Sequence, residues 1–112
     1  MSYENNQRNT QRVPASFPIN LSFGSQITLV GQIKDLSPKS AFINIRSSSI
    51  HMAIHDELTF CIENIPNNAE AAIKGSARIS RVAPGEGIAI FFTNMDEESA
   101  NLLQTFIDQL VK

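Results

Sequence analysis

The chain has 112 residues, of which 42% are hydrophobic and 18% charged, and its formal net charge is −2 at pH 7. This length supports one domain with one core, and the slightly acidic balance argues against a general nucleic-acid binder, which normally presents a basic face. Cys61 is the only cysteine, so an internal disulfide is excluded. No apolar run approaches the ~20 residues of a membrane span and the polar N-terminus lacks a signal-peptide core, so we expect a cytoplasmic protein without membrane insertion.

The N-terminal segment is predicted to be an arm outside the core. Residues 1–14 are rich in Asn, Gln, Ser and Arg and contain almost no apolar side chains, which is typical of a flexible terminus. Arg8 and Arg12 lie four residues apart in it, and Glu4 is the only carboxylate nearby. We therefore divide the chain into a flexible arm, 1–14, and a folded domain, 15–112. A segment that orders over a ligand and a terminus that stays disordered would have the same composition.

Five short stretches alternate between apolar and polar residues, which is the period of a strand with one buried face, and the apolar stretch at 88–92 makes a sixth predicted strand. They span residues 17–23, 27–33, 41–45, 57–63, 73–79 and 88–92. Pro18 has no backbone donor and is expected at a strand start or edge, and Gly31 suggests a bulge or bend in the second stretch. The number and spacing of the stretches predict an antiparallel barrel or sandwich.

The last part of the chain has the period of a helix. Its apolar residues recur at helical spacing: Leu102, Leu103, Phe106, Ile107 and Leu110. Asn94 and Glu97 fit a capping box, which predicts the start of the helix. We expect this C-terminal helix to pack across one opening or flank of the barrel.

Two polar clusters bracket the first two predicted strands. One is the arginine pair, and the other is the turn at residues 35–40, Asp-Leu-Ser-Pro-Lys-Ser. If the strands form a hairpin, the chain returns Asp35 and Ser37 towards the arm. An arginine fork can bind phosphate oxygens or the O6/N7 edge of guanine and can stack on the base, while an aspartate accepts from guanine N–H groups. The set therefore matches a guanine nucleotide, although Asp and Ser also cap their own turn readily.

These clusters resemble the signature of the PilZ domain family, RxxxR followed by (D/N)xSxxG. Arg8 and Arg12 fit the first half, Asp35 and Ser37 fit the second, and Ser40 stands where the family has glycine. The resemblance continues through residues 85–91 and the closing helix. It implies a six-stranded antiparallel β-barrel with a C-terminal α-helix. It also implies that the arginines grip the phosphates and guanine faces of cyclic di-GMP, often an intercalated ligand pair, and that Asp35 and Ser37 read a guanine edge.

Ser40 is the fifth residue of the predicted binding set, and four further residues are secondary candidates. Glycine at such a point usually indicates positive φ or close approach of a ligand. Ser40 could crowd the base or donate a hydrogen bond, and we expect binding that is weaker than in a glycine-bearing relative. The secondary candidates are Gln11, Lys39, Arg78 and Arg81. Since Arg78 and Arg81 are three residues apart, a regular strand would point them to opposite sides, so at most one is expected to join the site.

Metal binding and catalysis are not expected. His51, His55 and Asp56 superficially look like metal ligands, but an HxxxH pair in a loop is a weak signal and the family has no metal requirement. No serine, histidine and acid set has a recognisable nucleophile context, and no glycine-rich phosphate loop is present. We therefore expect a protein that is not an enzyme and needs no cofactor.

The resemblance indicates a stand-alone cyclic di-GMP receptor, a monomer or weak dimer, whose arm orders over the ligand and creates a surface for an unidentified protein partner. It implies a role in bacterial motility, surface attachment and biofilm, or exopolysaccharide control. One alternative is a non-binding PilZ-like adaptor, for example in pilus or motility function. Another is a barrel that binds single-stranded nucleic acid, which would need a basic groove with exposed aromatics. Most phenylalanines fall at the positions of the strand alternation that face the core, so no nucleic-acid partner is expected.

Overall fold

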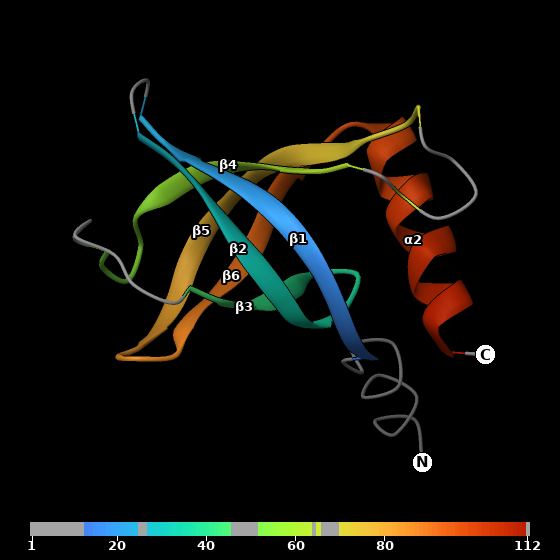
Figure 1. Ribbon diagram of the computed structural model, residues 1–112. Helices are drawn as coiled ribbons and strands as arrows, with labels where there is room; N and C mark the ends of the chain where they lie inside the picture. The colour runs from blue at the N-terminus through green and yellow to red at the C-terminus, as the bar shows by residue number, and fades with distance from the viewer. Residues whose placement is uncertain (1–12, 25–26, 46–51, 64, 66–69, 112) are drawn as a thin grey trace, which may run out of the picture.

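In the computed structural model the chain forms a closed antiparallel barrel followed by a helix (Figure 1). The structure describes residues 13–24, 27–45, 52–63, 65 and 70–111. The elements are β1 (Val13–Phe23), β2 (Ile27–Leu36), β3 (Ser40–Asn44), β4 (Glu57–Ile62), β5 (Ile73–Ala83), β6 (Gly87–Met95) and α2 (Glu97–Val111). The strand order around the barrel is β1-β2-β3-β6-β5-β4. The predicted six-stranded antiparallel barrel with a C-terminal helix is confirmed.

The barrel begins earlier in the chain than the alternation predicts. β1 starts at Val13, so Val13 and Pro14 lie in the barrel rather than in the predicted arm. The Val13 side chain is buried in the core, and its Cα is paired with that of Leu36 in β2. The register of β1 against β2 shifts between Pro14 and Phe17, so β1 has one extra residue there. The inward phase is kept through this bulge, because Val13, Ala15, Phe17 and Ile19 all lie on the more buried side of β1.

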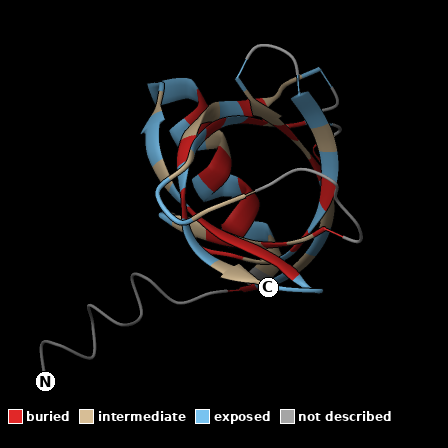
Figure 2. Cartoon of the chain, turned by 90° about the vertical axis from the view of Figure 1, so that its left-hand side faces the viewer, coloured by how far each residue is buried: buried red, intermediate tan, exposed pale blue. Residues whose placement is uncertain are grey.

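The first half of β1 has a free side within the described sheet. β1 pairs with β2 along its length, whereas its other side pairs with β4 only at residues 20–22. Pro18 lies outside that second ladder, where a missing N–H leaves no hydrogen bond unmade, as predicted. α2 contacts β1 and β5, and Phe106 meets Phe17 edge to face at 4.7 Å between ring centroids. In the end-on view the helix is seen through the ring of strands, so it covers one end of the barrel (Figure 2).

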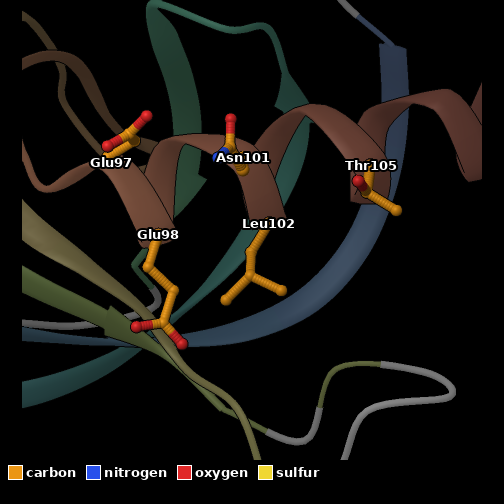
Figure 3. A pocket seen from close by; sticks show the side chains of 5 residues that line it. All are labelled: Glu97, Glu98, Asn101, Leu102 and Thr105. Atoms are coloured by element: carbon orange, nitrogen blue, oxygen red, sulfur yellow. The ribbon is translucent and has the colours of Figure 1, made fainter.

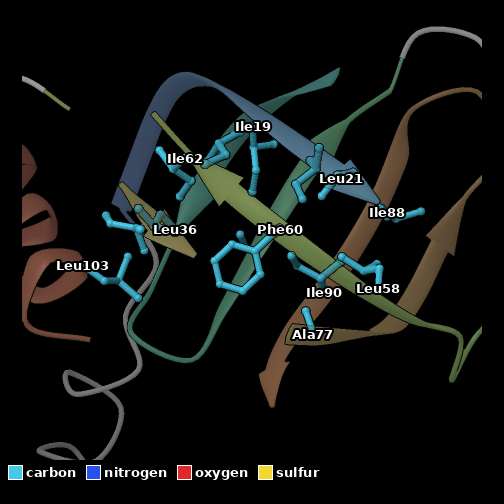
Figure 4. Close-up of a cluster of buried hydrophobic side chains, with 14 of the residues drawn as sticks. Ile19, Leu21, Leu36, Leu58, Phe60, Ile62, Ala77, Ile88, Ile90 and Leu103 are labelled. Carbon is cyan, nitrogen blue, oxygen red and sulfur yellow. The ribbon is translucent and has the colours of Figure 1, made fainter. Parts of the chain in front are cut away.

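The core consists of the inward residues of all six strands and the apolar face of α2. Isoleucine and leucine dominate it, and ten of its largest members are completely buried: Ile19, Leu21, Ile33, Leu36, Ile43, Ile62, Ile73, Ile79, Ile88 and Ile90. Phe60 lies in the middle of the cluster (Figure 4). The β-branched isoleucines suit a pleated surface, and the burial of the whole cluster is the main force that closes the barrel.

Gly31 allows β2 and β3 to approach closely, and no bulge, the first of the two predicted alternatives, lies at Gly31. It pairs with Ile19 in regular register, and the register shift of β2 against β3 lies further on, between Ile33 and Asp35. A Cβ at Gly31 would collide with the Cγ2 atom of Ile43 in β3. The glycine is therefore needed for packing against β3.

The start of α2 differs from the prediction. Asn94, the predicted cap, lies in β6 opposite Ser76, and α2 begins at Glu97. Asp96 is the cap instead, because its Oδ1 accepts a hydrogen bond from the Ser99 amide at 2.7 Å. The Ser99 hydroxyl in turn accepts from the amide of Lys74 at 3.2 Å, which ties the first turn of α2 to β5. Pairing with β5 extends β6 past the predicted cap. In the described residues no helix is long and apolar enough to span a membrane.

Asp96→Ala should lower the midpoint of thermal unfolding, because the Ser99 amide loses its acceptor. The hydrogen bond from that amide holds the pKa of Asp96 below its ordinary value. A pKa that is lower in the folded state gives stability that is full above the ordinary value, about 3.9, and is lost as pH falls through the lowered pKa. Circular dichroism melts from pH 7 to pH 2 should therefore show the difference between the two proteins shrinking in acid.

Glu98→Gln is the matched control, since it removes the same charge from the same helical turn and leaves the bond from Ser99 to Asp96 intact. Its effect should be smaller. Equal losses in the two variants would show that Asp96 acts through charge alone.

Candidate functional site

The segment carrying the arginine pair joins the barrel beside the turn at residues 35–40. Val13 is the Cα partner of Leu36, and Pro14 is the partner of Asp35. Gln11, Arg8 and Arg12 lie outside the described residues, so their positions follow only from chain connectivity. Arg12 is bonded directly to Val13, and the five residue-to-residue steps from Arg8 to Val13 can span at most about 17 Å. Both arginines are therefore tethered within reach of the turn.

A bulge places Asp35 on the outer surface. In regular alternation Asp35 would point inward with Ile33, which is completely buried. The register of β2 against β3 shifts between these two residues, so that Lys34 is the extra residue. As a result Leu36 is buried, and Asp35 is half-buried opposite Phe42, an outward position of β3. Bulges often re-aim a side chain in this way next to functional sites.

Ser37 holds the turn together from inside. Only 1% of its surface is exposed, although it is polar. Its Oγ accepts hydrogen bonds from the amides of Ser40 at 3.1 Å and Lys39 at 3.3 Å, and its own amide donates to the Ser40 carbonyl at 2.8 Å. The hydroxyl therefore acts as the internal cap of the turn, and it fixes the backbone that follows Asp35.

Ser40 occupies the motif's glycine position without backbone strain. Of the described non-glycine residues only His55 has a positive φ, so Ser40 needs no left-handed conformation. The Oγ atoms of Ser40 and Ser37 lie 3.1 Å apart in a hydrogen bond. Ser40 begins β3 and pairs with Phe91 of β6. A glycine here would therefore differ in side-chain space and hydrogen bonding, and the difference would not lie in the backbone angle.

The tip of the turn is bonded to β6 and borders a groove that α2 also lines. The amide of Phe92 donates to the Lys39 carbonyl at 2.8 Å, while the Lys39 side chain is exposed. Pro38 lines a groove of about 300 Å³ together with Phe92 of β6 and Leu103 of α2. The turn and the helix thus form two walls of the same groove.

Arg78 and Arg81 both face outward, which corrects the expectation of opposite sides. β5 is not a regular strand, because its register against β6 shifts between Ile79 and Arg81 and leaves Ser80 as the extra residue. Ile79 points into the core, and both arginines are exposed. Arg78 forms an ion pair with Glu57 of β4 at 2.8 Å. With exposures of 49% and 75%, this pair contributes little to stability.

Arg81 shares a cross-strand row with Asp35. The Cα partners run from Arg81 to Ala89 in β6, then to Phe42 in β3 and to Asp35 in β2. The guanidinium carbon of Arg81 lies 5.5 Å from the centre of the Phe42 ring. Phe91 of β6, which is 49% exposed, lies between Arg78 and Ser40 in a neighbouring row. The outer face beside the turn therefore carries two aromatic rings and two arginines.

Sequence reasoning missed Phe42 and Phe91. We assigned most phenylalanines to the core by alternation, yet both lie at outward positions of the sheet. The sequence did indicate that Phe42 faces outward, because it lies between Ala41 and Ile43, which alternation assigns to the core. Ala41 and Ile43 are both completely buried. Phe91 is adjacent to Phe92 in the sequence, so alternation alone leaves open which of the two faces outward.

A pocket on α2 is unsuited to an anion. It has a volume of about 420 Å³ and is lined by Glu97, Glu98, Asn101, Leu102 and Thr105 (Figure 3). Its charged groups are carboxylates, which repel phosphate. The cationic and hydrogen-bonding groups described above lie on the strands instead.

No metal or nucleophile constellation is present in the described residues. They contain no cluster of three His, Cys, Asp or Glu side chains that could hold an ion, and His51 lies outside them. Asp56 caps its own turn by accepting from the amide of Ala53 at 2.9 Å. Partial burial raises the pKa of the Cys61 thiol, which disfavours the reactive thiolate.

The sequence profile of the PilZ domain family matches residues 6–109, so it covers the arginine pair, the turn, the whole barrel and most of the helix. The chain belongs to the PilZ domain family. Among curated proteins no sequence matches it significantly.

Solved PilZ domains share the fold. The PilZ domain of CeSA from a cellulose-synthesizing bacterium superposes with a TM-score of 0.70 at 20% identity, over 92% of this chain and 100% of that one. The PilZ domain of YcgR from Escherichia coli, solved with c-di-GMP, gives 0.71 at 14% identity, over 94% and 92%. Borreliella burgdorferi PlzA, solved in complex with c-di-GMP, gives 0.63 at 20% identity, over 94% of this chain and 43% of PlzA. This chain thus spans less than half of PlzA.

Ser37→Ala should destabilise the domain by about 1–3 kcal/mol, because the amides of Lys39 and Ser40 lose an acceptor inside the turn. Urea unfolding followed by circular dichroism measures the change. Ser40→Ala serves as the control, since it removes a hydroxyl of the same turn and leaves both amides bonded to Ser37. An equal effect of the two substitutions would contradict the role of Ser37 as the cap.

Proposed function

We propose that this protein is a cyclic di-GMP receptor that signals by ordering its N-terminal arginine arm against the turn at residues 35–40. The observation that carries the proposal is the pairing of Pro14 with Asp35, which tethers the arm beside that turn. Membership of the PilZ family supports it, as do two structural neighbours solved with c-di-GMP. PilZ domains act as receptors or adaptors and not as enzymes, which agrees with a binding role.

The chemistry of the two halves is complementary to different parts of the ligand. Arg8 and Arg12 supply planar, permanently charged forks for the phosphates and for the faces of the bases. Asp35 repels phosphate but accepts hydrogen bonds from the N–H groups on one edge of guanine. The phosphates therefore lie towards the arm, and a guanine edge lies towards Asp35. Ser37 supports this arrangement by fixing the turn, and Lys39 adds a cation at its exposed tip.

The same turn offers a route from ligand to partner. Pro38 lines a groove with β6 and α2, so an arm that orders against the turn changes the surface next to this groove. An unidentified protein partner would bind to that new surface. The resulting role in motility, biofilm or exopolysaccharide control follows from the family and not from any residue of this chain.

The alternative is an adaptor that has lost the nucleotide and only docks proteins. Ser40 at the glycine position favours it, because its side chain occupies space beside the turn. The retention of Arg8, Arg12, Asp35 and Ser37 favours the receptor, since a site without a ligand has no evident need for this set.

Isothermal titration with cyclic di-GMP should give saturable binding that Arg8→Ala or Arg12→Ala abolishes. Each arginine supplies charge-assisted hydrogen bonds worth about 1.5–3 kcal/mol apiece. GTP should give no comparable heat. Lys74→Gln is the control, since it removes a cation from the outer face of β5, opposite Cys61 of β4, and leaves the arm and the turn unchanged. An absence of heat and of chemical-shift changes at near-millimolar ligand would contradict the receptor and favour the adaptor.

Ser40→Gly should raise the affinity for cyclic di-GMP, because it frees space beside the turn while the Ser37 hydroxyl still holds the Ser40 amide. The same titration measures the change, with thermal melts to show that the fold is kept. An unchanged or lower affinity would mean that the Ser40 side chain does not crowd the ligand, and that its hydroxyl is neutral or helpful.

A further inference from the structure

We propose that Phe42 and Arg81 form the stacking wall of the nucleotide site: the guanine whose edge meets Asp35 lies on the ring of Phe42, and Arg81 closes over the opposite face of the base. This inference rests on the proposed function and adds two residues outside the RxxxR and (D/N)xSxxG motifs.

The positions of the three residues support an edge contact and a face contact with the same base. Asp35 and Phe42 are Cα partners on neighbouring strands, which lie about 4.8 Å apart. Both occupy outward positions, so a base that directs its N–H edge at the carboxylate extends over the adjacent ring. A planar edge contact and a stacking contact act in perpendicular directions, so one base can make both.

Arg81 already spans the distance to this ring. The Cα partner of Arg81 is Ala89 in β6, and Phe42 lies on the next strand, β3. The guanidinium carbon of Arg81 nevertheless lies 5.5 Å from the centre of the Phe42 ring. Ala89 faces outward between them, is only 5% exposed and does not belong to the core cluster. The Arg81 side chain therefore passes over Ala89, and the small alanine makes this path possible. A larger side chain there would separate the guanidinium from the ring.

The existing contact shows that the ring has a face on which a flat cationic group can rest. A guanidinium stacks on aromatic rings and on bases alike, so Arg81 can leave the ring and rest on an inserted guanine. The side chain is exposed and has several rotatable bonds, which makes this movement easy. Its charge also offsets the negative charge that Asp35 and the phosphates bring to the site.

Two β-bulges make the arrangement possible. The extra residue in β2, Lys34, turns Asp35 outward, and the extra residue in β5, Ser80, turns Arg81 outward. Without either bulge, one of the two side chains would point into the core. Both irregularities thus bring charged groups to the same row on the same face.

The test combines calorimetry with proton NMR of the ligand. Phe42→Leu should weaken cyclic di-GMP binding about tenfold to a hundredfold, because base-aromatic stacking is lost, and Phe42→Tyr should restore it. Arg81→Gln should weaken binding as well. The guanine H8 resonance should move upfield on binding to the wild type and to Arg81→Gln, but less on binding to Phe42→Leu, since the ring current of Phe42 is absent. Thermal melts confirm the fold of each variant.

Lys74→Gln is the matched control, because it removes the same charge as Arg81→Gln from the outer face of the same strand, and it should bind like the wild type. Wild-type affinity and an unchanged H8 shift in both Phe42→Leu and Arg81→Gln would overturn the stacking wall while leaving the receptor function intact. A wild-type protein that does not bind cyclic di-GMP would overturn the proposed function and this inference with it.

Discussion

The antiparallel pairing of β1 with β2 is the contact on which the site depends. It aligns Pro14 with Asp35, so that the end of the arm and the start of the turn are held side by side by backbone hydrogen bonds. These two segments are more than twenty residues apart in the sequence. A loop of that length would hold them together only at a considerable loss of chain entropy, which the ladder and the buried side chains of the hairpin offset. The arm needs no further anchor to remain close to the turn.

The chemistry of the outer face depends on departures from regular strand geometry. A barrel must bury one side of each strand, and strict alternation would then place Asp35 and Arg81 inside. An unpaired charge in that aliphatic core would be strongly unfavourable. Each bulge removes the conflict by inserting one residue, which keeps Ile33, Leu36 and Ile79 buried while the charged side chains face water. The barrel thus keeps a continuous apolar interior and still presents a polar row.

Charge is divided between the parts of the molecule. The strands carry the exposed arginines, and the outer surface of α2 carries carboxylates in its first turn. The helix therefore covers one end of the barrel and forms one wall of the groove beside Pro38, while the exposed arginines lie on the strands. Ser37 links these regions, because its buried hydroxyl fixes the turn that follows Asp35 and borders the groove beside α2.

The sequence by itself determined the fold class, the helix and the motif residues. Alternation and helical period are local properties, and the RxxxR and Asp-x-Ser patterns can be read from the residue types alone. The tertiary structure decided the rest, because the phase of a strand after a bulge depends on its partner strand. Pairing with β2 brought Val13 and Pro14 into the barrel, and pairing with β5 moved the helix cap from Asn94 to Asp96. The outward positions of Asp35, Phe42 and Arg81 arise in the same way, from registers that involve four different strands.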